Sequence, residues 1–197
     1  MGGEGVGLEW GEMGRPHSPV PKISTKSYTV QKELTMWELL KKHDVMEVLG
    51  IFSGYYEGEA GVLGYDPHFL ERNLTMATTL QEYDKSKEFI AIYREEEILG
   101  ACWFDRGGYA AYSTKEISNA KFHHVRLDLP VKKRIRLVNQ MIDQHILWAH
   151  NWGIPVVCSS SVRVEHEGFM RIHEKRGFTV HGSFAWIGTE EGMKWIR

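Results

Sequence analysis

One long amphipathic segment, flanked on both sides by short apolar runs, dominates the second half of the sequence. It follows Pro130 and ends at Gly153, and its apolar residues recur at steps of three and four: Ile135, Val138, Ile142, Ile146 and Ala149. This period predicts a helix that is apolar along one side. Residues 121–127 and 154–158 have the composition of strands. A long helix between two strands covers one face of a sheet, so the sequence predicts an α/β domain.

Two further helices are predicted before this segment, each from its starting residues. Residues 35–38, Thr-Met-Trp-Glu, form a capping box, in which hydroxyl and carboxylate satisfy each other's backbone donors, and they predict a helix to about Leu49. Asp66 and Pro67 are a typical cap and first-turn pair, and they predict a second helix to about Glu82. Both helices precede the apolar runs that predict the sheet.

The remaining apolar runs indicate a mixed sheet. Two β-favouring runs are joined by a charged turn at 94–97, which is typical of a hairpin. In chain order, the further predicted elements are a strand over 24–30, a hairpin over 88–104, a short helix over 165–176 that Gly177 ends, and a strand over 178–187.

The composition is that of one globular domain. The chain has 197 residues, 42% hydrophobic and 25% charged, and Lys+Arg 24 against Asp+Glu 26 gives a net charge of −2. This charge argues against general nucleic-acid or membrane-surface binding. Cys102 and Cys158 are too few for a disulfide framework. No apolar run approaches the roughly 18 residues of a membrane span, and the N-terminus lacks the apolar centre of a signal peptide, so a cytoplasmic protein is expected.

Residues 1–22 differ from the rest of the chain. They are rich in Gly and Pro, which disfavours regular structure, but they also include apolar side chains such as Leu8 and Trp10. One interpretation is a flexible tail; the other is an arm that packs on a partner or on its own domain. The expected organisation is an extended N-terminal arm over 1–22 and a domain over 23–197. A protein partner for the arm and an oligomeric state both stay open.

The order of the predicted elements and one C-terminal motif resemble the GNAT family of N-acetyltransferases. The motif is Phe-Met-Arg-Ile-His-Glu-Lys-Arg-Gly-Phe at residues 169–178, an apolar helix that ends in a charged pair, Gly and Phe. The resemblance covers roughly residues 24–187. It implies a mixed, mostly antiparallel sheet flanked by helices. It also implies transfer of an acetyl group from acetyl-CoA to the amine of a small molecule or a protein.

The resemblance places the coenzyme site at the start of the long helix. Family members carry Gln or Arg and then two Gly residues, whose amides approach the pyrophosphate; these positions here hold Val131, Arg134 and Arg136. Cations there interact unfavourably with the helix dipole, and each one destabilises the helix by roughly 0.3–1 kcal/mol unless an anion binds beside it. A phosphate-bearing ligand, coenzyme A first, is one interpretation, and a solvated basic face with Asp128 as helix cap is the other. The expected cofactor-binding residues, with the pantetheine arm near the strand end, are Leu127, Leu129, Lys132, Lys133, Arg134, Ile135 and Arg136.

Two residues are catalytic candidates. His173 lies four residues before the motif's glycine, where the family often has a Tyr that protonates the leaving thiolate; a His can do this near neutral pH, or it is simply a buried helix residue. Asp128, at the end of the predicted strand, is a candidate base or only a helix cap. His123 and His124 are expected on opposite faces of that strand. No metal site is expected, since residues 166–170 fail the HExxH pattern at its last position.

Two functions therefore stay open. The element order and the basic cluster favour an acetyl-CoA-dependent N-acetyltransferase. The absent glycines favour a catalytically degenerate GNAT-like fold that serves as a structural or binding protein. Some bacteriophage-encoded GNAT-like proteins are of this second kind, and a virion component assembled through residues 1–22 would be one example.

Overall fold

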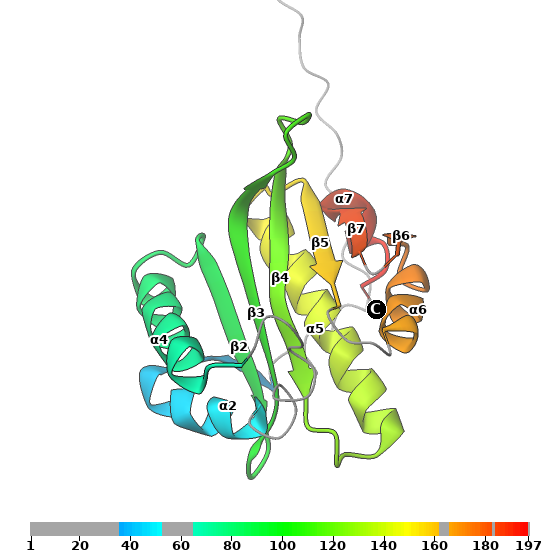
Figure 1. Cartoon of the computed structure of the whole chain (residues 1–197). Coiled ribbons are helices and arrows are strands. Elements are labelled where there is room, and N and C mark those ends of the chain that lie inside the picture. The colour runs from blue at the N-terminus through cyan, green and yellow to red at the C-terminus, as the bar shows by residue number, and fades with distance from the viewer. Residues whose placement is uncertain (1–35, 53–64, 162–165, 183, 197) are drawn as a thin grey trace, which may run out of the picture.

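Seven strands in the described part of the chain form one sheet, in the order β1-β2-β3-β4-β5-β7-β6 (Figure 1). The computed structural model describes residues 36–52, 65–161, 166–182 and 184–196. Among these strands only β4 and β5 pair in parallel, so the predicted mixed, mostly antiparallel sheet is confirmed. The strands are β1 (Trp37–Leu39), β2 (Glu88–Arg94), β3 (Ile98–Tyr109), β4 (Glu116–Val125), β5 (Val156–Ser160), β6 (Thr179–His181) and β7 (Phe184–Gly188).

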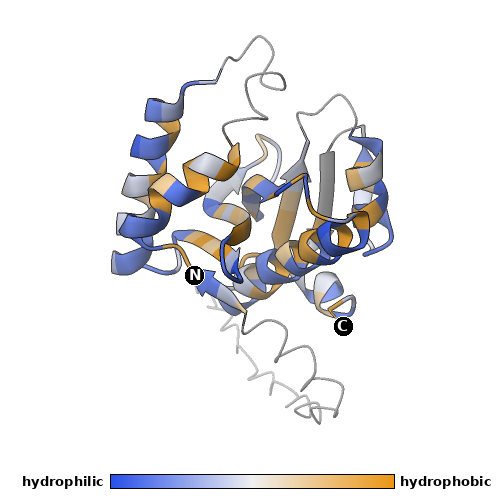
Figure 2. Ribbon diagram, turned by 90° about the horizontal axis from the view of Figure 1, so that it is seen from below, coloured by the Kyte–Doolittle hydropathy of each residue, from blue (hydrophilic) through white to orange (hydrophobic). Residues whose placement is uncertain are grey.

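Helices cover both faces of this sheet (Figure 1), and the ribbon coloured by hydropathy has hydrophobic residues on the helix sides that face the sheet (Figure 2). Alternation along β2 divides the core in two. Ile90 and Ile92 pack with α2 and α4, whereas Ala91 and Tyr93 pack on the opposite side with α5. The helical elements are η1 (Lys42–Asp44), α2 (Val45–Phe52), α4 (Pro67–Tyr83), α5 (Val131–Asn151), α6 (Glu167–Glu174) and α7 (Thr189–Met193).

The two longest helices confirm their predictions. Asp66 caps α4, since its carboxylate accepts hydrogen bonds from the amides of His68 (2.9 Å) and Phe69 (3.1 Å), and Pro67 opens the helix. Helix α5 ends two residues before Gly153, which has a φ of 67°. This left-handed conformation suits glycine, as expected of a residue that stops a helix.

The start of the described chain corrects one prediction. Residues 37–39, expected within a helix opened by the capping box, form β1 and pair antiparallel with β2, and the helix begins later, at Val45. Trp37 is buried against Tyr93, with ring centroids 5.5 Å apart, and its indole N–H donates to Gln140 Oε1 at 3.2 Å. These tertiary contacts outweigh the local capping signal. The predicted strand 24–30 and the predicted arm 1–22 lie outside the described residues.

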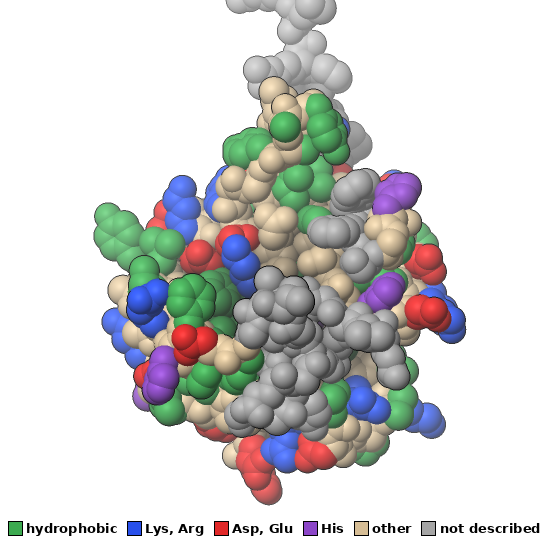
Figure 3. Space-filling view, viewed as in Figure 1, with side chains coloured by type: hydrophobic (Ala, Val, Ile, Leu, Met, Phe, Trp, Pro, Cys, Tyr) green, Lys and Arg blue, Asp and Glu red, His purple; other side chains and the backbone are tan. Residues whose placement is uncertain are grey.

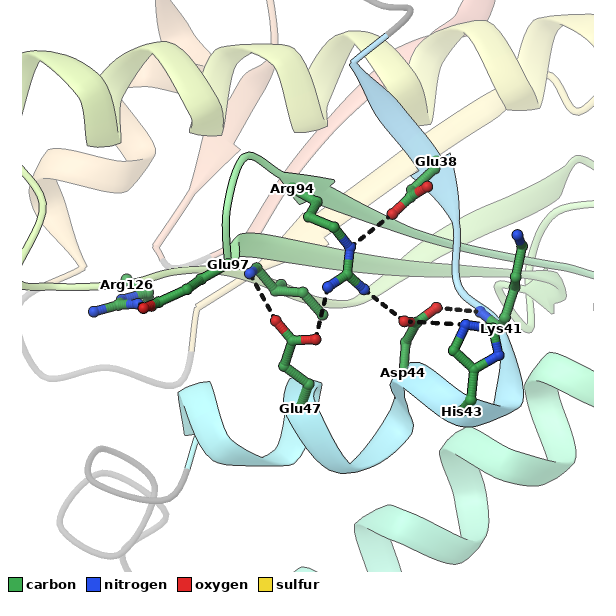
Figure 4. Close-up of polar contacts among 9 residues, drawn as sticks. Glu38, Lys41, His43, Asp44, Glu47, Arg94, Glu97 and Arg126 are labelled. Carbon is green, nitrogen blue, oxygen red and sulfur yellow. Dashed lines mark hydrogen bonds and ion pairs between the residues drawn. The ribbon is translucent and has the colours of Figure 1, made fainter.

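One arginine ties the first described elements to the sheet (Figure 4). The guanidinium of Arg94, on β2, donates to Glu38 on β1 at 2.9 Å, to Asp44 on η1 at 2.5 Å and to Glu47 on α2 at 2.7 Å. The second carboxylate oxygen of Glu47 accepts the amide of Ile98 at 2.9 Å. Arg94 therefore fixes three consecutive elements against β2 and β3.

The structure changes the predicted bounds of two strands. The strand expected over 178–187 is two strands, β6 and β7, with Gly182 at a φ of 62° after β6. Strand β4 begins earlier than expected, at Glu116, because the β3–β4 hairpin projects beyond the body of the sheet (Figure 1).

On the face seen in Figure 3, acidic and basic side chains are interspersed. Among the described residues, no helix is long and apolar enough to cross a membrane.

Strands β4 and β5 separate after a short parallel ladder, and this separation positions the candidate site. Their register joins Ile117 to Val156 and ends at Asn119 and Cys158. Beyond that pair, β4 continues to Val125 and β5 to Ser160. The facing edges of the two strands therefore diverge beside α5 and α6.

Candidate functional site

A pocket of about 570 Å³ lies where β4 and β5 separate, between α5 and α6. The strands supply one wall and the two helices supply the others. Its lining residues are Lys121, Phe122, His123, Val125, Leu127, Val131, Arg134, Ile135, Val138, Asn139, Ser160, Ser161, Gly168, Phe169, Arg171, Ile172 and Lys175.

Helix α5 presents one face to the pocket. Val131, Ile135 and Val138 line it at helical spacing, so this wall is largely apolar. Val131 and Ile135 are 59% and 46% exposed, which is unusual for aliphatic side chains of a helix packed on a sheet. An apolar wall that stays accessible is suited to a ligand with an alkyl-like chain.

The structure separates the four cations at the start of α5. Arg134 lines the pocket, and its Nε is buried with no hydrogen-bond partner among the described residues. Lys133 instead donates to Glu95 Oε2, in the β2–β3 turn, at 2.7 Å. Lys132 and Arg136 do not line the pocket. A buried guanidinium N–H without an acceptor is costly, so Arg134 is the one of the four that is poised for an anionic ligand in this pocket.

The helix start offers few backbone donors. The N-cap residue is Pro130, which has no amide N–H, and its carbonyl accepts the amides of Lys133 (2.9 Å) and Arg134 (3.1 Å). Within the described structure, the amides of Val131 and Lys132 are therefore the two that α5 can direct at an anion.

Asp128 does not cap α5, which corrects that interpretation. Its carboxylate instead accepts two bonds from Arg126, at 3.1 Å from Nε and 2.6 Å from Nη2. The hydrogen bond from Arg126 lowers the pKa of Asp128, and the side chain is 59% exposed. Leu127 lines the pocket, whereas Asp128 does not and Leu129 packs against the core.

His173 is buried in α6 behind the pocket and does not line it. Its Nδ1 lies 3.0 Å from the carbonyl oxygen of Phe169, and since a carbonyl only accepts, Nδ1 carries the proton. In the neutral ring Nε2 then holds a lone pair, and it has no partner among the described residues. Burial lowers the pKa of His173 to about 4. This imidazole is therefore neutral near pH 7, with its one N–H occupied.

His123 lines the pocket, whereas the catalytic candidates that the sequence favoured, His173 and Asp128, do not. It lies on β4 with its ring centroid 6.2 Å from those of His145 and His173. Burial, and next the nearby His173, lower its pKa to about 3, and its Nε2 has no partner among the described residues. His124 points to the other side, where its Nε2 contacts the carbonyl of Ile51 at 2.8 Å. The predicted opposite orientation of this pair is confirmed.

The third histidine of this group lies on α5. His145 stacks on Phe104 at 4.0 Å, and its Nε2 is 2.6 Å from Ser118 Oγ. Burial is the main cause that lowers its pKa well below the ordinary value. Among the described residues no group of three His, Cys, Asp or Glu side chains is arranged to hold a metal ion.

Comparison with known proteins places the fold. No model of a known protein family matches the sequence, and no curated protein matches it. Solved structures do. YncA from Salmonella typhimurium, determined with its cofactor acetyl-CoA, is 13% identical and gives a TM-score of 0.60 over 78% of this chain and 92% of that one. The acetyltransferase of the GNAT family from Streptococcus pneumoniae is 12% identical, with a TM-score of 0.55 over 77% and 97%.

A third similar structure is the ribosomal-protein-S5-alanine acetyltransferase of Vibrio fischeri. It is 11% identical and gives a TM-score of 0.55 over 78% of this chain and 92% of that one. At these identities the likeness establishes the fold. The chain therefore has the fold of GNAT acetyltransferases, as the resemblance in its sequence implies.

Proposed function

We propose that this pocket binds acetyl-CoA and that the protein transfers the acetyl group to an amine. Arg134 carries the proposal, because its buried Nε, which has no partner among the described residues, lies in a wall whose other members include Val131 and Ile135. Coenzyme A combines an anionic diphosphate with a long pantetheine chain. The pocket offers a partner for each, because Arg134 suits the diphosphate and the apolar wall of α5 suits the pantetheine chain. The bound coenzyme supplies an activated thioester.

The diverging strands give the pantetheine arm its backbone partners. After Asn119, the edge of β4 that faces β5 has no ladder partner in the described structure. Backbone groups there are strong hydrogen-bonding groups that need partners. An extended, amide-containing chain laid between β4 and β5 would meet them, and Leu127, which follows β4 in the chain, lines the same pocket.

We assign proton transfer to His123. Of the described residues that line the pocket, it is the one with an imidazole, which can take a proton on one ring nitrogen and pass it on, and its low pKa makes it a weak base that releases the proton quickly. Attack by the amine on the thioester carbon makes a C–N bond and a positively charged nitrogen. The Nε2 lone pair of His123 takes the proton from that nitrogen and returns it to the sulfur as the C–S bond breaks. His173, which does not line the pocket, supports the ring from behind.

The test is turnover. The full-length protein is incubated with acetyl-CoA and a panel of amines that includes polyamines, aminoglycosides and peptides with free N-termini, and the thiol of released CoA is measured. Release that depends on one acceptor class, with a mass increase of one acetyl group on the acceptor, is the expected result. Tight CoA binding without turnover on any of the amines contradicts the enzymatic part of the proposal.

A second candidate function is favoured by a different observation. Pro130 at the N-cap has no amide N–H, and two arginines at the glycine positions place side chains where the family's glycines let the pyrophosphate approach the backbone amides. A protein altered in this way could serve as a structural or binding component, such as a phage virion protein assembled through residues 1–22. Deletion of residues 1–22 should then abolish assembly in sedimentation experiments; unchanged sedimentation contradicts this candidate.

A further inference from the structure

Helix α6 presents two parallel rows of side chains to the same pocket. Phe169 and Ile172 form an apolar row, and Arg171 and Lys175 form a basic row one helical turn apart. Gly168 begins the basic row with no side chain, which leaves room beside it. The composition of this wall therefore mirrors that of α5, where apolar residues and Arg134 share one face.

A buried ion pair fixes the position of α6 against α5. Arg176, adjacent to Lys175, pairs with Asp143 of α5, and both side chains are only 10% exposed. The same guanidinium donates to Asn139 Oδ1 at 3.3 Å, and Asn139 itself lines the pocket. The chain just after α6, including Lys175, is thereby held against the middle of α5, because Asn139 and Asp143 lie five and nine residues beyond Arg134 in that helix.

The α5 wall alone is a weak site for a diphosphate. Among the described residues it offers two backbone amides and one pocket-facing cation, because Lys133 pairs with Glu95 outside the pocket. A diphosphate carries two negative charges and binds best when several charge-assisted hydrogen bonds converge on it. Cations from the opposite wall would supply the missing charge.

We propose that Arg171 and Lys175 form the second half of a phosphate clamp whose first half is Arg134. The ligand class is a diphosphate ester, and the identification of that ester as coenzyme A rests on the proposed function. Arg171 currently pairs with Glu167 at 3.2 Å, but both side chains are more than two-thirds exposed. Exposed pairs of this kind are weak, so the guanidinium can exchange its partner for a phosphate.

The experiment is isothermal titration of the full chain with three probes: CoA, ADP, which has a diphosphate but no pantetheine, and pantetheine, which has no phosphate. The variants are Arg171→Gln, Lys175→Gln and the double variant, with Lys132→Gln as the matched control. Lys132 belongs to the same basic helix start, its side chain does not line the pocket, and the substitution by Gln keeps its backbone amide. The double variant should lose about tenfold or more in affinity for CoA and ADP. Pantetheine affinity should not change, and Lys132→Gln should stay within about twofold of the parent.

Two results would overturn the clamp. One is a double variant that binds CoA and ADP as well as the parent does. The other is an equal loss in Lys132→Gln, which would mean general attraction and not a defined site. Arg171 and Lys175 are exposed, so the urea midpoint of each variant should match the parent and exclude misfolding as the cause.

The clamp and the proposed function can fail separately. A parent that does not bind CoA contradicts the proposed function, and the clamp is then tested with ADP and inorganic pyrophosphate. Binding of either probe that is lost in the double variant supports the clamp without CoA. Absence of binding to both probes overturns the clamp.

Discussion

Arg176, in the turn that follows α6, and Asp143 of α5 form an ion pair in which each side chain is only 10% exposed. The pair joins the two helices that form opposite walls of the pocket, and Asn139 extends the contact as an acceptor for the same guanidinium. Pocket geometry and fold stability are therefore linked through one arginine. A charge pair in such surroundings holds position well, because loss of one partner leaves the other charge buried.

Replacement of Arg176 by Met should destabilise the protein by roughly 3–5 kcal/mol, because it leaves the Asp143 carboxylate buried without its partner. Urea denaturation followed by circular dichroism measures the change. The double variant Arg176→Met/Asp143→Leu should recover most of the loss, since neither charge is then buried. A single variant with the stability of the parent contradicts a stabilising pair.

Stability should fall at acidic pH because of three histidines, His123, His145 and His173, whose pKa values are lowered in the folded protein. Burial lowers the pKa of His173 to about 4 and that of His123 to about 3, below the unfolded value of about 6.5. The unfolded chain thus binds more protons, so the stability that these groups confer is complete above about pH 6.5 and is lost as the pH falls toward the folded pKa values. For His173 the loss between pH 7 and pH 4 is roughly 3 kcal/mol.

The measurement is urea denaturation of the parent and of His173→Phe at pH 7 and at pH 4. Phenylalanine fits the aromatic surroundings of His173, which contacts Phe169 and Phe178. The variant should lose less stability on acidification than the parent does. Equal acid sensitivity of the two proteins would show that His173 is not the group responsible.

How far the sequence predicted the fold depends on where the information lies. Asp66 with Pro67, and the apolar period of α5, are local signals, and both predicted their helices correctly. The capping box at residues 35–38 is also local, but a cap contributes only about 1 kcal/mol. The burial of Trp37 against Tyr93 and the pairing of β1 with β2 oppose it, and those contacts join residues far apart in the chain.

Gly177 to Ala should be much more costly than Gly153 to Ala. Both glycines have a positive φ, 82° and 67°, so each alanine carries a conformational cost of roughly 1 kcal/mol or more. A Cβ on Gly177 would also collide with the Trp195 ring, whereas nothing lies within 4 Å of one on Gly153. We expect a loss of roughly 3 kcal/mol at Gly177, measured as a lower urea midpoint. Equal losses at both positions would exclude a role for the Trp195 contact.

Part of the candidate pocket could be predicted from the sequence, and individual residues show why the rest could not. The cluster of cations at the start of α5 is visible in the sequence. Helical spacing would also have distinguished Arg134, which shares a face with Val131 and Val138, from Lys132 and Arg136, which do not. The alternation of side chains along a strand could have favoured His123 over His124 as the residue that faces the pocket. Arg171 and Lys175 could not have been found, because their presence in the same pocket as Arg134 depends on how α6 packs beside α5. The interpretation of Asp128 as a helix cap rested on its position before the predicted helix. In the structure its carboxylate instead accepts two hydrogen bonds from Arg126.

His123→Gln should separate binding from chemistry. Glutamine retains hydrogen-bonding capacity but cannot shuttle a proton, so kcat should fall by about 10²–10⁴ while affinity for CoA stays within about twofold. The rate is followed through CoA release with the acceptor that the amine panel identifies. An unchanged kcat would contradict the assignment of His123, and a parallel loss of CoA affinity would show that the residue serves binding instead.

Calorimetric titration of the full chain with acetyl-CoA, compared with Arg134→Gln and with Lys132→Gln, tests the account most directly. Arg134 places a buried, unpartnered Nε in the pocket wall, whereas Lys132 lies outside the lining. The account predicts saturable binding by the parent, a loss of about tenfold or more in Arg134→Gln and an affinity within about twofold of the parent in Lys132→Gln. No detectable heat from the parent at high acetyl-CoA concentration, or full affinity in Arg134→Gln, would contradict it.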